Sequence, residues 1–573
     1  MLFSACEKLL EPENDNHSTL DRVYGDPTYA EGLLMTAYSY IPTNSYRWDD
    51  VATDDAVTND KFNSYLRIAT GEWSSLYNPQ DLWGNGNLAI LYINQFLSLI
   101  DSVQWKWTDK TLNDLYIRRL SGESYALRGL FKYFLLRNHA GFSDDGTLLG
   151  IPDCNKFLET QEDFESPRLT FAESVQSAYD DFDKALELLP MDYGDVNSNE
   201  ELPANFKGVS DYSDYNTTNG DYYIQRMSGR HVVAFEARLA LLAASPAFNT
   251  GNDATLWENA ANYAGKLLTD YGGPNALDPD GNLFYLKDQV NKGDVTKGNY
   301  IKEILWRRPM STNRSRESNN FPPSLFGNGD INPTQNLVDA FPMLNGYPID
   351  DEVNSGYDKT NPYNNRDPRL SQDIVFNGSM MKSNIIHTSV DGGDDGLDAL
   401  VNSTRTGYYL RKLLREDCNC DPSHTSDQKH YETHIRYTEL FLLYAEAANE
   451  VWGPDGTGTF SFSARDVISA IRERAGLNQP DAYLASISSK EAMRTLIHNE
   501  RRLELCFESF RFWDIRRWKN DLTIPAIGVR IEDGDYTRFT VEERAYDNAY
   551  MNYGPIPDSD VLKFGIIQNQ GWN

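Results

Sequence analysis

The sequence predicts a mostly α-helical protein in which degenerate, tetratricopeptide-like helix pairs form a scaffold that carries a large loop-rich insertion with short strands. Three observations support this fold class. Apolar residues recur at helical spacing on both sides of residues 274–430, and one helix has the spacing of a tetratricopeptide repeat. Between those helical regions, turn-forming dipeptides are dense.

The helix-pair prediction starts from residues 170–189, where Ala178 and Phe182 are among the residues at the offsets of the second helix of a tetratricopeptide repeat. Residues 229–245 are rich in alanine, which permits close helix packing, and residues 257–268 show apolar spacing typical of the next helix. Because unequal insertions separate these helices, we expect a few degenerate pairs in a curved scaffold and not a regular array.

The segment 274–430 differs from its surroundings in its turn chemistry. It contains Asp280-Gly281, Asn328-Gly329 and Asn345-Gly346, which are typical of turns. A long loop-rich segment inside a helical chain indicates a functional surface, so we expect it to form part of a ligand-binding face. The predicted organisation is a signal remnant at 1–6, an N-terminal helical region with aromatic loops at 7–273, the insertion at 274–430 and a C-terminal helical region at 431–573.

Composition narrows the classes of partner. The chain has 573 residues and a net charge of -32, so phosphate backbones are repelled at long range and nucleic acid is excluded as a partner. Aromatic residues make up 12% of the chain, and they provide both core packing and flat faces for stacking on a ligand. Even the apolar run at 232–248 contains Glu236 and Arg238, so no bilayer-spanning helix is predicted.

The segment 499–518 combines fixed charges with large apolar side chains. A helix over about 489–508 would place Glu500, Glu504 and Glu508 one turn apart, and such carboxylates need cationic partners. Arginine can bridge carboxylates with two hydrogen bonds in a partly buried setting. The expected ion-pair lattice consists of Glu500, Arg502, Glu504, Glu508, Arg511, Asp514 and Arg516.

An alternative interpretation makes Glu504 and Glu508 the acid and nucleophile of a glycosidase, with Asp49 and Asp54 as a second possible pair. A general acid requires a raised pKa, whereas nearby arginines stabilise the ionised carboxylate. We therefore favour the structural interpretation and predict no catalytic residues. No nucleotide-binding loop, nucleophile elbow or His-Glu-x-x-His motif occurs, and no cofactor is predicted.

The cysteines and histidines near residue 420 permit two interpretations. Cys418 and Cys420 with His424, His430 and His434 could bind zinc, but the single residue between the cysteines is a tighter spacing than zinc sites usually have. A turn in an irregular loop is the favoured interpretation, and no metal site is predicted.

The run N-E-R-R-L-E-L-x-F-E-x-x-R-F-x-D-I-R-R-W, from Asn499 to Trp518, resembles the C-terminal signature of the SusD/RagB family of outer-membrane nutrient-binding lipoproteins. Segments 333–341, 365–370 and 435–450 also resemble family motifs, so the resemblance extends over nearly the whole chain. Within these motifs we expect Arg366 and Arg369 to tie the loops to the scaffold.

The resemblance implies a cell-surface lipoprotein. Small residues before Cys6 are typical of the end of a lipoprotein signal, and Cys6 would then be lipidated. The alternative is an idle cysteine in a disordered N-terminus. The family role is to bind an oligosaccharide on the extracellular side of the outer membrane and deliver it to a SusC-like TonB-dependent transporter. A peptide-binding family member and a secreted glycoside hydrolase are the alternatives.

Sugar binding needs flat aromatic faces with polar groups at their edges. Aromatic and acidic residues are mixed in the loops near residues 48 and 77 and around residue 306, although such aromatics can also plug the ends of helices. Trp83 is left out because it precedes a helix at a position where the family carries a packing aromatic. The predicted ligand-binding residues are Trp48, Asp49, Trp73, Tyr77, Asp81, Trp306 and Arg307.

Overall fold

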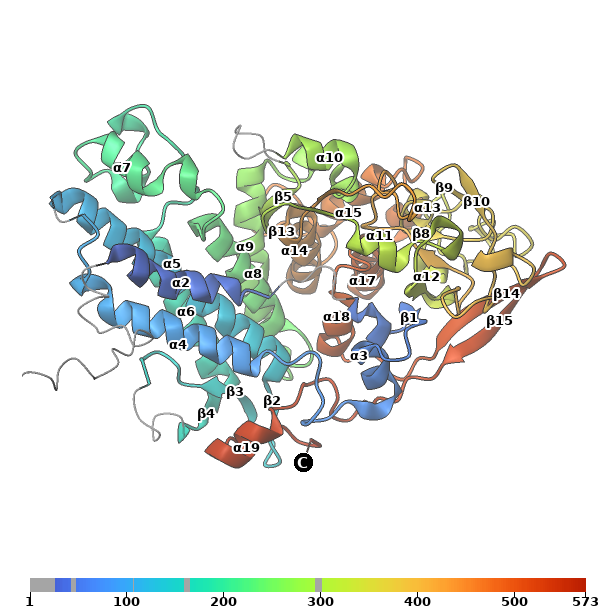
Figure 1. Cartoon of the computed structure of the whole chain (residues 1–573), viewed down its shortest axis with the longest axis horizontal. Helices are drawn as coiled ribbons and strands as arrows, with labels where there is room; N and C mark the ends of the chain where they lie inside the picture. The colour runs from blue at the N-terminus through green and yellow to red at the C-terminus, as the bar shows by residue number, and fades with distance from the viewer. Residues whose placement is uncertain (1–25, 43–47, 107, 159–164, 294–300, 573) are drawn as a thin grey trace, which may run out of the picture.

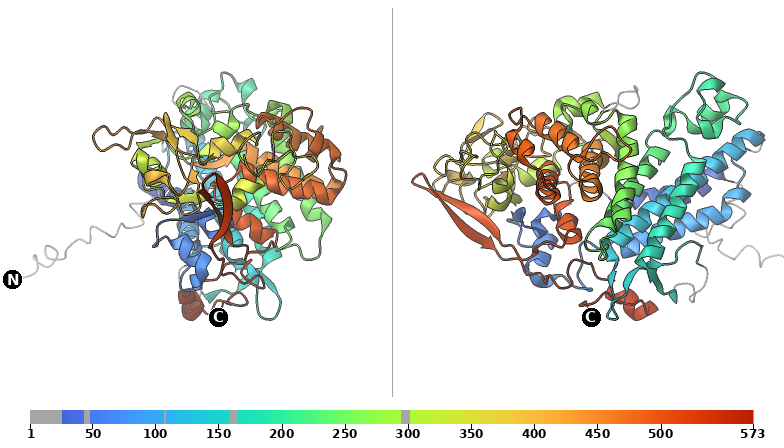
Figure 2. Two further views of the ribbon diagram at one scale, coloured as in Figure 1. Left: turned by 90° about the vertical axis from the view of Figure 1, so that its right-hand side faces the viewer. Right: turned by 180° about the vertical axis from the view of Figure 1, so that it is seen from behind.

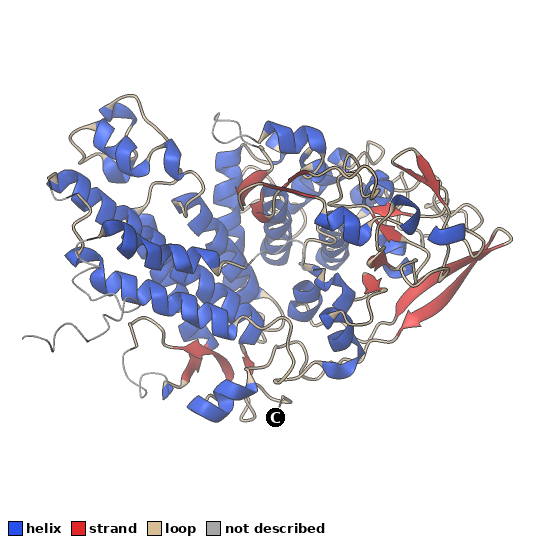
Figure 3. Ribbon diagram, in the orientation of Figure 1, coloured by secondary structure: helices blue, strands red, loops and turns tan. Residues whose placement is uncertain are grey.

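The computed structural model describes residues 26–42, 48–106, 108–158, 165–293 and 301–572. Helices dominate this part of the chain and the strands are short, which confirms the predicted fold class (Figure 3). Long helices occupy one side of the molecule in Figure 1, and short helices and strands joined by loops occupy the other.

The N-terminal helices form the first part of the scaffold. Helix α2 (Pro27–Ser39) packs on α4 (Trp83–Leu99), which packs on α5 (Lys110–His139), and α5 packs along α6 (Phe171–Leu188). Helix α6 begins with a capping box, in which Thr170 Oγ1 accepts the Glu173 N–H and Glu173 accepts the Thr170 N–H. The predicted repeat-like helix is therefore present.

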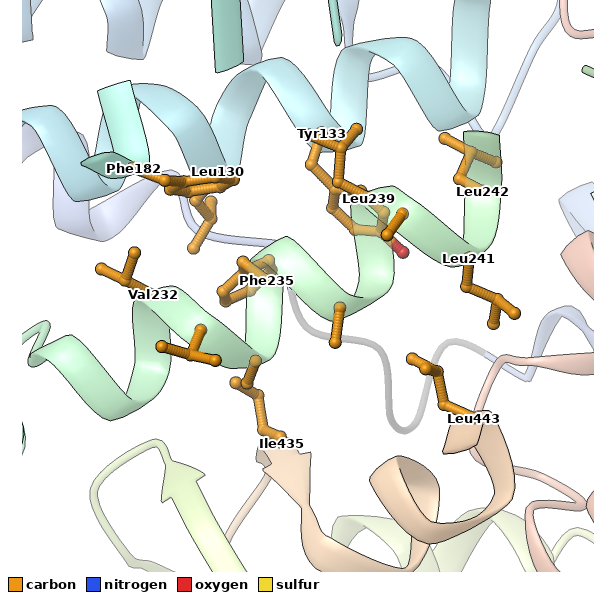
Figure 4. Packing of buried hydrophobic residues seen from close by; sticks show 14 of the residues in the cluster. Leu130, Tyr133, Phe182, Val232, Phe235, Leu239, Leu241, Leu242, Ile435 and Leu443 are labelled. Atoms are coloured by element: carbon orange, nitrogen blue, oxygen red, sulfur yellow. The ribbon is translucent and has the colours of Figure 1, made fainter. Parts of the chain in front are cut away.

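Helix α8 (Gly229–Ala244) lies in the middle of the scaffold. It contacts α5 and α6 on one side and α9 (Ala254–Tyr271) and α14 (Tyr437–Trp452) on the other. Figure 4 shows Phe235 of α8 between the side chains of Leu130 and Phe182 and the side chain of Ile435. Almost every residue of α8 is buried, which explains its alanine-rich, nearly uniformly apolar sequence.

The C-terminal part of the scaffold contains α15 (Ala464–Arg474), α17 (Lys490–Glu504) and α18 (Arg511–Arg517). The prediction of one helix over 489–508 was wrong at its C-terminal end, because α17 ends at Glu504. Phe507 and Ser509 both have φ of 61°, a left-handed conformation that a helix cannot continue. Glu508 therefore lies in a tight turn and not one helical turn beyond Glu504.

The insertion leaves and rejoins the scaffold at one place. Tyr271 ends α9 and Tyr437 begins α14, and their ring centroids are 4.0 Å apart. Strand β13 (Thr433–Arg436) pairs with β5 (Ile304–Arg307) next to this point. The helices of the insertion are α10 (Lys287–Lys292), α11 (Ser315–Asn320), α12 (Gln335–Ala340) and α13 (Pro368–Asp373).

The strands form small antiparallel sheets. Strand β1 (Ala56–Thr58) pairs with β7 (Ile331–Pro333), which joins the N-terminal region to the insertion. The hairpin of β14 (Ala526–Glu532) and β15 (Asp535–Glu542) projects at one end of the molecule (Figures 1 and 2). The other strands are β2 (Gly141–Phe142), β3 (Leu148–Pro152), β4 (Arg168–Thr170), β6 (Ser311–Asn313), β8 (Ile374–Val375), β9 (Ser379–Met381), β10 (Asn384–Ile386), β11 (Tyr409–Leu410) and β12 (Gln428–His430).

The remaining helices are short, and they are α3 (Ser64–Arg67), α7 (Tyr212–Asn219), α16 (Ala482–Ser486) and α19 (Asp558–Phe564). Within the described residues, no helix has both the length and the apolar character needed to cross a membrane.

Candidate ligand surface

The carboxylates of α17 meet arginines from distant parts of the chain. Glu500 accepts hydrogen bonds from Arg369 Nη2 at 2.9 Å and from Arg472 Nη1 at 2.6 Å. Arg369 belongs to α13, so this contact joins the insertion to the scaffold. Arg366 donates to the carbonyl oxygens of Val338 and Phe341 inside the insertion. Arg369 thus has the tethering role that we expected.

Glu504 and Glu508 have equally dense cationic surroundings. Glu504 lies 2.6 Å from Arg474 Nη2 and 3.4 Å from Arg436 Nη1, and Glu508 lies 2.7 Å from Arg436 Nε and 3.0 Å from Lys412 Nζ. Burial acts to raise the pKa of Glu504, but the surrounding guanidinium groups outweigh it and lower the pKa to about 2. Both carboxylates are buried, so neither is placed to meet a substrate.

The arginines next to these glutamates in sequence pair with other carboxylates. Arg502 contacts Asp54 and Asp55, and Arg511 contacts Asp54 at 2.9 Å and Asp55 at 3.6 Å. These two aspartates follow the loop that contains Trp48. The network therefore fixes the N-terminal loop region to the turn between α17 and α18.

Asp514 and Arg516 behave differently from each other. Asp514 accepts hydrogen bonds from Arg501 at 2.7 Å and Arg517 at 2.8 Å. Arg516 has no carboxylate partner among the described residues, and its guanidinium lies 3.5 Å from the ring centroid of Phe512. Burial lowers the pKa of Arg516 to about 10. Arg516 is a buried cation among aromatic rings and not a bridge between carboxylates, which corrects the prediction for this residue.

Trp73 is a core residue and does not offer a face to a ligand. Only 4% of its surface is exposed, and its indole N–H donates to Asn78 Oδ1 at 3.0 Å. Its ring packs edge-on against Trp572 at 4.8 Å and Phe512 at 5.6 Å. The ring therefore plugs the interface between the N-terminal loops and the C-terminal segment, and the expectation of a stacking platform at Trp73 was wrong.

The expectation for Trp306 and Arg307 was wrong for the same reason. Trp306 is 3% exposed, its N–H donates to the Gln225 carbonyl, and it packs 4.3 Å from the ring of His434. Arg307 donates to the carbonyl oxygens of Arg308 and Gly293. Both residues lie on β5, at the base of the insertion where strands must pack against the scaffold.

The other predicted residues have mixed positions. Asp49 is buried and accepts a hydrogen bond from Gln80 at 2.7 Å, so it ties two loops together and cannot line a surface. Trp48 and Tyr77 are half-buried. Asp81 is exposed, but its Oδ1 accepts the Trp83 N–H at 2.7 Å at the start of α4. Burial therefore removes Asp49 from the predicted surface contacts, whereas Trp48, Tyr77 and Asp81 stay predictions.

Three other loops form a surface with the required mixture of side chains. We define the three-loop surface as residues 59–63, 326–330 and 400–402. The β1–β7 pair places the first two loops side by side, and Asn59 Nδ2 donates to the carbonyl oxygens of Asn328 and Gly329, both at 2.9 Å. Asn402 Nδ2 donates to the Gly327 carbonyl at 3.3 Å, which adds the third loop.

Each loop of the three-loop surface presents an apolar side chain to solvent. Phe62 is 90% exposed, Phe326 is 56% exposed and Val401 is 85% exposed. Exposed apolar side chains gathered on adjacent loops mark interaction sites. Asp60 and Asp330 provide carboxylates beside them, and burial together with the charge of Asp60 raises the pKa of Asp330 to about 6.

The three-loop surface is held in a defined shape. Phe326 has φ of 63°, and Gly329 has φ of 54°, where the backbone favours glycine. A Cβ at Gly329 would lie 2.5 Å from the Asn402 carbonyl oxygen, so the close approach of the two loops requires glycine. The sequence predicted a turn at Asn328-Gly329, but the position of this turn next to the loop of Phe62 depends on β1 pairing with β7.

Two pockets lie near the C-terminus, and both are lined in part by α19. A pocket of about 280 Å³ includes Leu76, Asp81 and Asp558 in its wall. A larger pocket of about 500 Å³ is mainly apolar and includes Trp83 and Phe564. Trp83 donates to Asp560 Oδ1 at 3.2 Å, so it packs against α19 as well as lining the pocket. These pockets are a second possible ligand area, although they expose less aromatic surface than the three-loop surface does.

Comparisons with known proteins agree with the fold. The family model described as "SusD family" matches residues 302–572, and the model described as "Starch-binding associating with outer membrane" matches residues 10–201. A SusD-like protein of Formosa agariphila is 35% identical over 88 residues, which cover 15% of this chain. That match spans only 16% of the relative's length.

Solved structures are similar over almost the whole chain. A SusD-like protein from Bacteroides fragilis has a TM-score of 0.69 at 22% identity and covers 98% of this chain and 100% of its own. A SusD-like carbohydrate binding protein from the same species has a TM-score of 0.67 at 20% identity, covering 95% of this chain and 99% of its own. A surface glycan-binding protein A from Bacteroides fluxus has a TM-score of 0.58 at 16% identity, covering 96% and 100%. Together, the two family models and the shared fold identify this chain as a member of the SusD/RagB family.

Proposed function

We propose that this protein is a surface-exposed, lipid-anchored protein that binds an oligosaccharide and passes it, chemically unchanged, to a SusC-like TonB-dependent transporter in the outer membrane. The observation that carries the proposal is the three-loop surface, where exposed apolar side chains stand beside carboxylates and amides on fixed loops. Similar structures include a carbohydrate binding protein and a surface glycan-binding protein, which supports a glycan as the ligand.

The chemistry of the three-loop surface suits a sugar. A pyranose ring has apolar C–H faces, which pack on rings such as Phe62, and hydroxyl groups at its edge, which bond to groups such as Asp60. Because hydrogen bonds already position the loops, little conformational entropy is lost on binding. Trp48, Tyr77 and Asp81 remain predicted ligand contacts.

A binding role without catalysis is supported by the state of the carboxylates. The proposed glycosidase pair, Glu504 and Glu508, is buried and held by cations, and the low pKa of Glu504 opposes a role as general acid. Incubation with a panel of glycans should therefore give retarded migration of the protein without new reducing ends. Release of product would favour the hydrolase.

Substitution of the exposed rings tests the ligand surface. Phe62→Ala and Phe326→Ala should each weaken binding of the cognate glycan by on the order of 1–3 kcal/mol, which is about 5- to 150-fold in Kd, with little change in Tm. The matched control is Tyr222→Ala, because Tyr222 is a 91% exposed ring on the segment between α7 and α8. Calorimetry on a glycan identified from an array would measure the affinities.

Two outcomes of this experiment would redirect the proposal. If both phenylalanine variants bound the glycan as the parent does, the three-loop surface would not be the site and the pockets beside α19 would be tested next. If a peptide panel bound at the three-loop surface while glycans did not, the peptide-binding alternative would replace the glycan.

Attachment to the membrane rests on Cys6, which lies outside the described residues. The net charge of -32 opposes adsorption to an anionic membrane, so acyl chains must supply the attraction. When it is expressed with a lipoprotein signal peptide, the Cys6→Ala variant should fractionate as a soluble protein. Cells that lack the transporter are the necessary background, because retention of the variant there would contradict lipid anchoring.

A further inference from the structure

Three buried side chains in the insertion bring together different metal-binding atoms. Glu317 lies on α11, Cys418 follows a turn in which its N–H donates to the Arg415 carbonyl, and His430 ends β12. All three are buried, and their ligand atoms lie within 4.8 Å of one another. They come from three separate segments, so their convergence results from the fold and not from local sequence.

The pairing of two strands brings these three side chains together. Strand β12 pairs with β6 so that His430 lies opposite Ser311, and α11 begins just after β6. The backbone N–H of Arg415 donates to Glu317 Oε1 at 2.7 Å, which fixes one carboxylate oxygen and leaves Oε2 facing His430. Glu317 Oε2 accepts no hydrogen bond of regular geometry within the described part of the chain.

Two of the three separations between ligand atoms can be compared with those around a tetrahedral metal ion. His430 Nε2 lies 3.3 Å from Glu317 Oε2 and 3.9 Å from Cys418 Sγ. With zinc bonds of about 2.0–2.1 Å to nitrogen and oxygen and about 2.3 Å to sulfur, tetrahedral angles give separations of about 3.3–3.4 Å for N and O and about 3.5–3.6 Å for N and S. The first distance matches, and the second needs a contraction of a few tenths of an ångström.

Charge balance also favours a divalent cation. Burial and the neighbouring Glu317 raise the pKa of the Cys418 thiol, but coordination to a metal ion stabilises the thiolate. A divalent cation with one thiolate, one carboxylate and one neutral imidazole forms a group with no net charge, which lowers the cost of burying it. The adjacent Arg415 is engaged by Asp417, with two contacts of 2.8 Å, and does not compete for the cluster.

We propose that Glu317, Cys418 and His430 bind Zn²⁺ as a structural site that joins α11, the turn at 415–418 and β12. Thiolate and imidazole ligands select zinc over Ca²⁺ or Mg²⁺, which prefer oxygen ligands. The cluster offers three protein ligands among the described residues, so a water molecule would have to supply the fourth. The sequence interpretation as a simple turn missed this arrangement because Glu317 is distant in sequence, and because Cys420, His424 and His434 are not part of the cluster.

Cobalt substitution tests the site. The full chain is freed of metal with a chelator and titrated with Co²⁺, whose charge-transfer band in the near ultraviolet reports thiolate ligation. We expect one equivalent to bind, Zn²⁺ to displace it, and the band to be absent in Cys418→Ser. Cys420→Ser is the matched control, since the Sγ of Cys420 lies 3.6 Å from Ser318 Oγ and outside the cluster, and it should keep the band.

Further variants separate ligation from folding. His430→Gln and Glu317→Gln keep the thiol and should weaken Co²⁺ binding by more than the roughly 10- to 100-fold that loss of a hydrogen bond to a metal ligand costs. Zn²⁺ should raise the Tm of the parent and of Cys420→Ser but not that of Cys418→Ser. If Cys418→Ser fails to fold, the parent titration and the two glutamine variants decide the result. Absence of a stoichiometric band in the parent, or equal bands in both serine variants, would overturn the proposal.

Discussion

The ion-pair network around α17 and the three-loop surface contain similar residue types but use them in opposite ways. In the network, Glu504 is surrounded by arginines of the same chain and Phe512 is fully buried. On the three-loop surface, Phe62 is exposed and, within the described structure, the Asp60 carboxylate accepts a hydrogen bond from the nearby Phe62 N–H and has no cationic partner. A mixture of aromatic and charged residues therefore indicates a binding site only where the chain itself leaves those groups available.

The largest expected effect comes from breaking the network. Arg436→Met removes the cation shared by Glu303, Glu504 and Glu508, and it should destabilise the protein by about 3–5 kcal/mol because buried carboxylates lose compensation. The control is Arg67→Met, which removes an exposed ion pair with Glu72 and a contact with the Tyr77 ring and should cost much less stability than Arg436→Met. Denaturant unfolding measures the free energy of unfolding of both variants. Similar losses in the two variants would show that the buried network stabilises the protein no more than an exposed ion pair does.

A second prediction sets core rings against surface rings. Trp73→Ala and Trp306→Ala should lower stability by about 3–5 kcal/mol, because each leaves a cavity in a packed region. Their folded fraction should bind glycan with parental affinity, in contrast to Phe62→Ala. A variant at Trp73 that kept the parental Tm and lost binding would return this ring to the ligand site.

The two regions should also respond to pH with opposite signs. The pKa of Glu504 is about 2 in the folded protein against 4.5 when unperturbed, so its stabilising effect is present above about pH 4.5 and is lost as the pH falls toward 2. Asp330 has its pKa raised to about 6 from 3.8, so its ionisation removes stability as the pH rises through this range.

Melting temperatures measured across pH 3–8 test both signs. In the Glu504→Gln variant, the melting temperature should fall less steeply toward acid pH than in the parent. In Asp330→Asn, the melting temperature should vary less with pH near pH 5–6 than in the parent. If the Glu504→Gln variant lost melting temperature toward acid pH as steeply as the parent does, carboxylates other than Glu504 would be responsible for the acid sensitivity.

The smallest predicted effect concerns Tyr77, a residue at the border between core and surface. The guanidinium of Arg67 lies 4.0 Å from its ring centroid, and an exposed cation–π contact of this kind adds only a little stability. Tyr77→Phe should keep this stability and Tyr77→Ala should lose it. If Tyr77→Ala also weakened glycan binding by tenfold, the ligand surface would extend from the three-loop surface to this loop.

The scaffold was predictable because its signals are local. The spacing around Ala178 and Phe182 lies within one helix, and Trp83, which was left out of the ligand set as a packing residue, is only 4% exposed. The end of α17 was not predictable, since Phe507 and Ser509 adopt left-handed conformations without glycine. The partners of Glu500 were also not predictable, because Arg369 and Arg472 reach it from other segments of the chain.

The ligand surface was less predictable than the scaffold for a physical reason. Trp73 and Phe62 both lie in aromatic stretches of the N-terminal loops, and only the tertiary structure buries one and exposes the other. Likewise, Phe326 gains its position when β7 pairs with β1. Burial depends on contacts between distant segments, which residue type and spacing within one loop do not report.

The contact between Tyr271 and Tyr437 has a consequence for how such a protein can diversify. Because the insertion departs and returns at touching residues, its length can change without stretching the scaffold, and the entropy of closing a longer loop grows only slowly. New recognition loops can thus arise by insertion or deletion. The freedom is limited at Arg369 and Lys412, since a shortened insertion that lost them would leave Glu500 and Glu508 with fewer counter-ions.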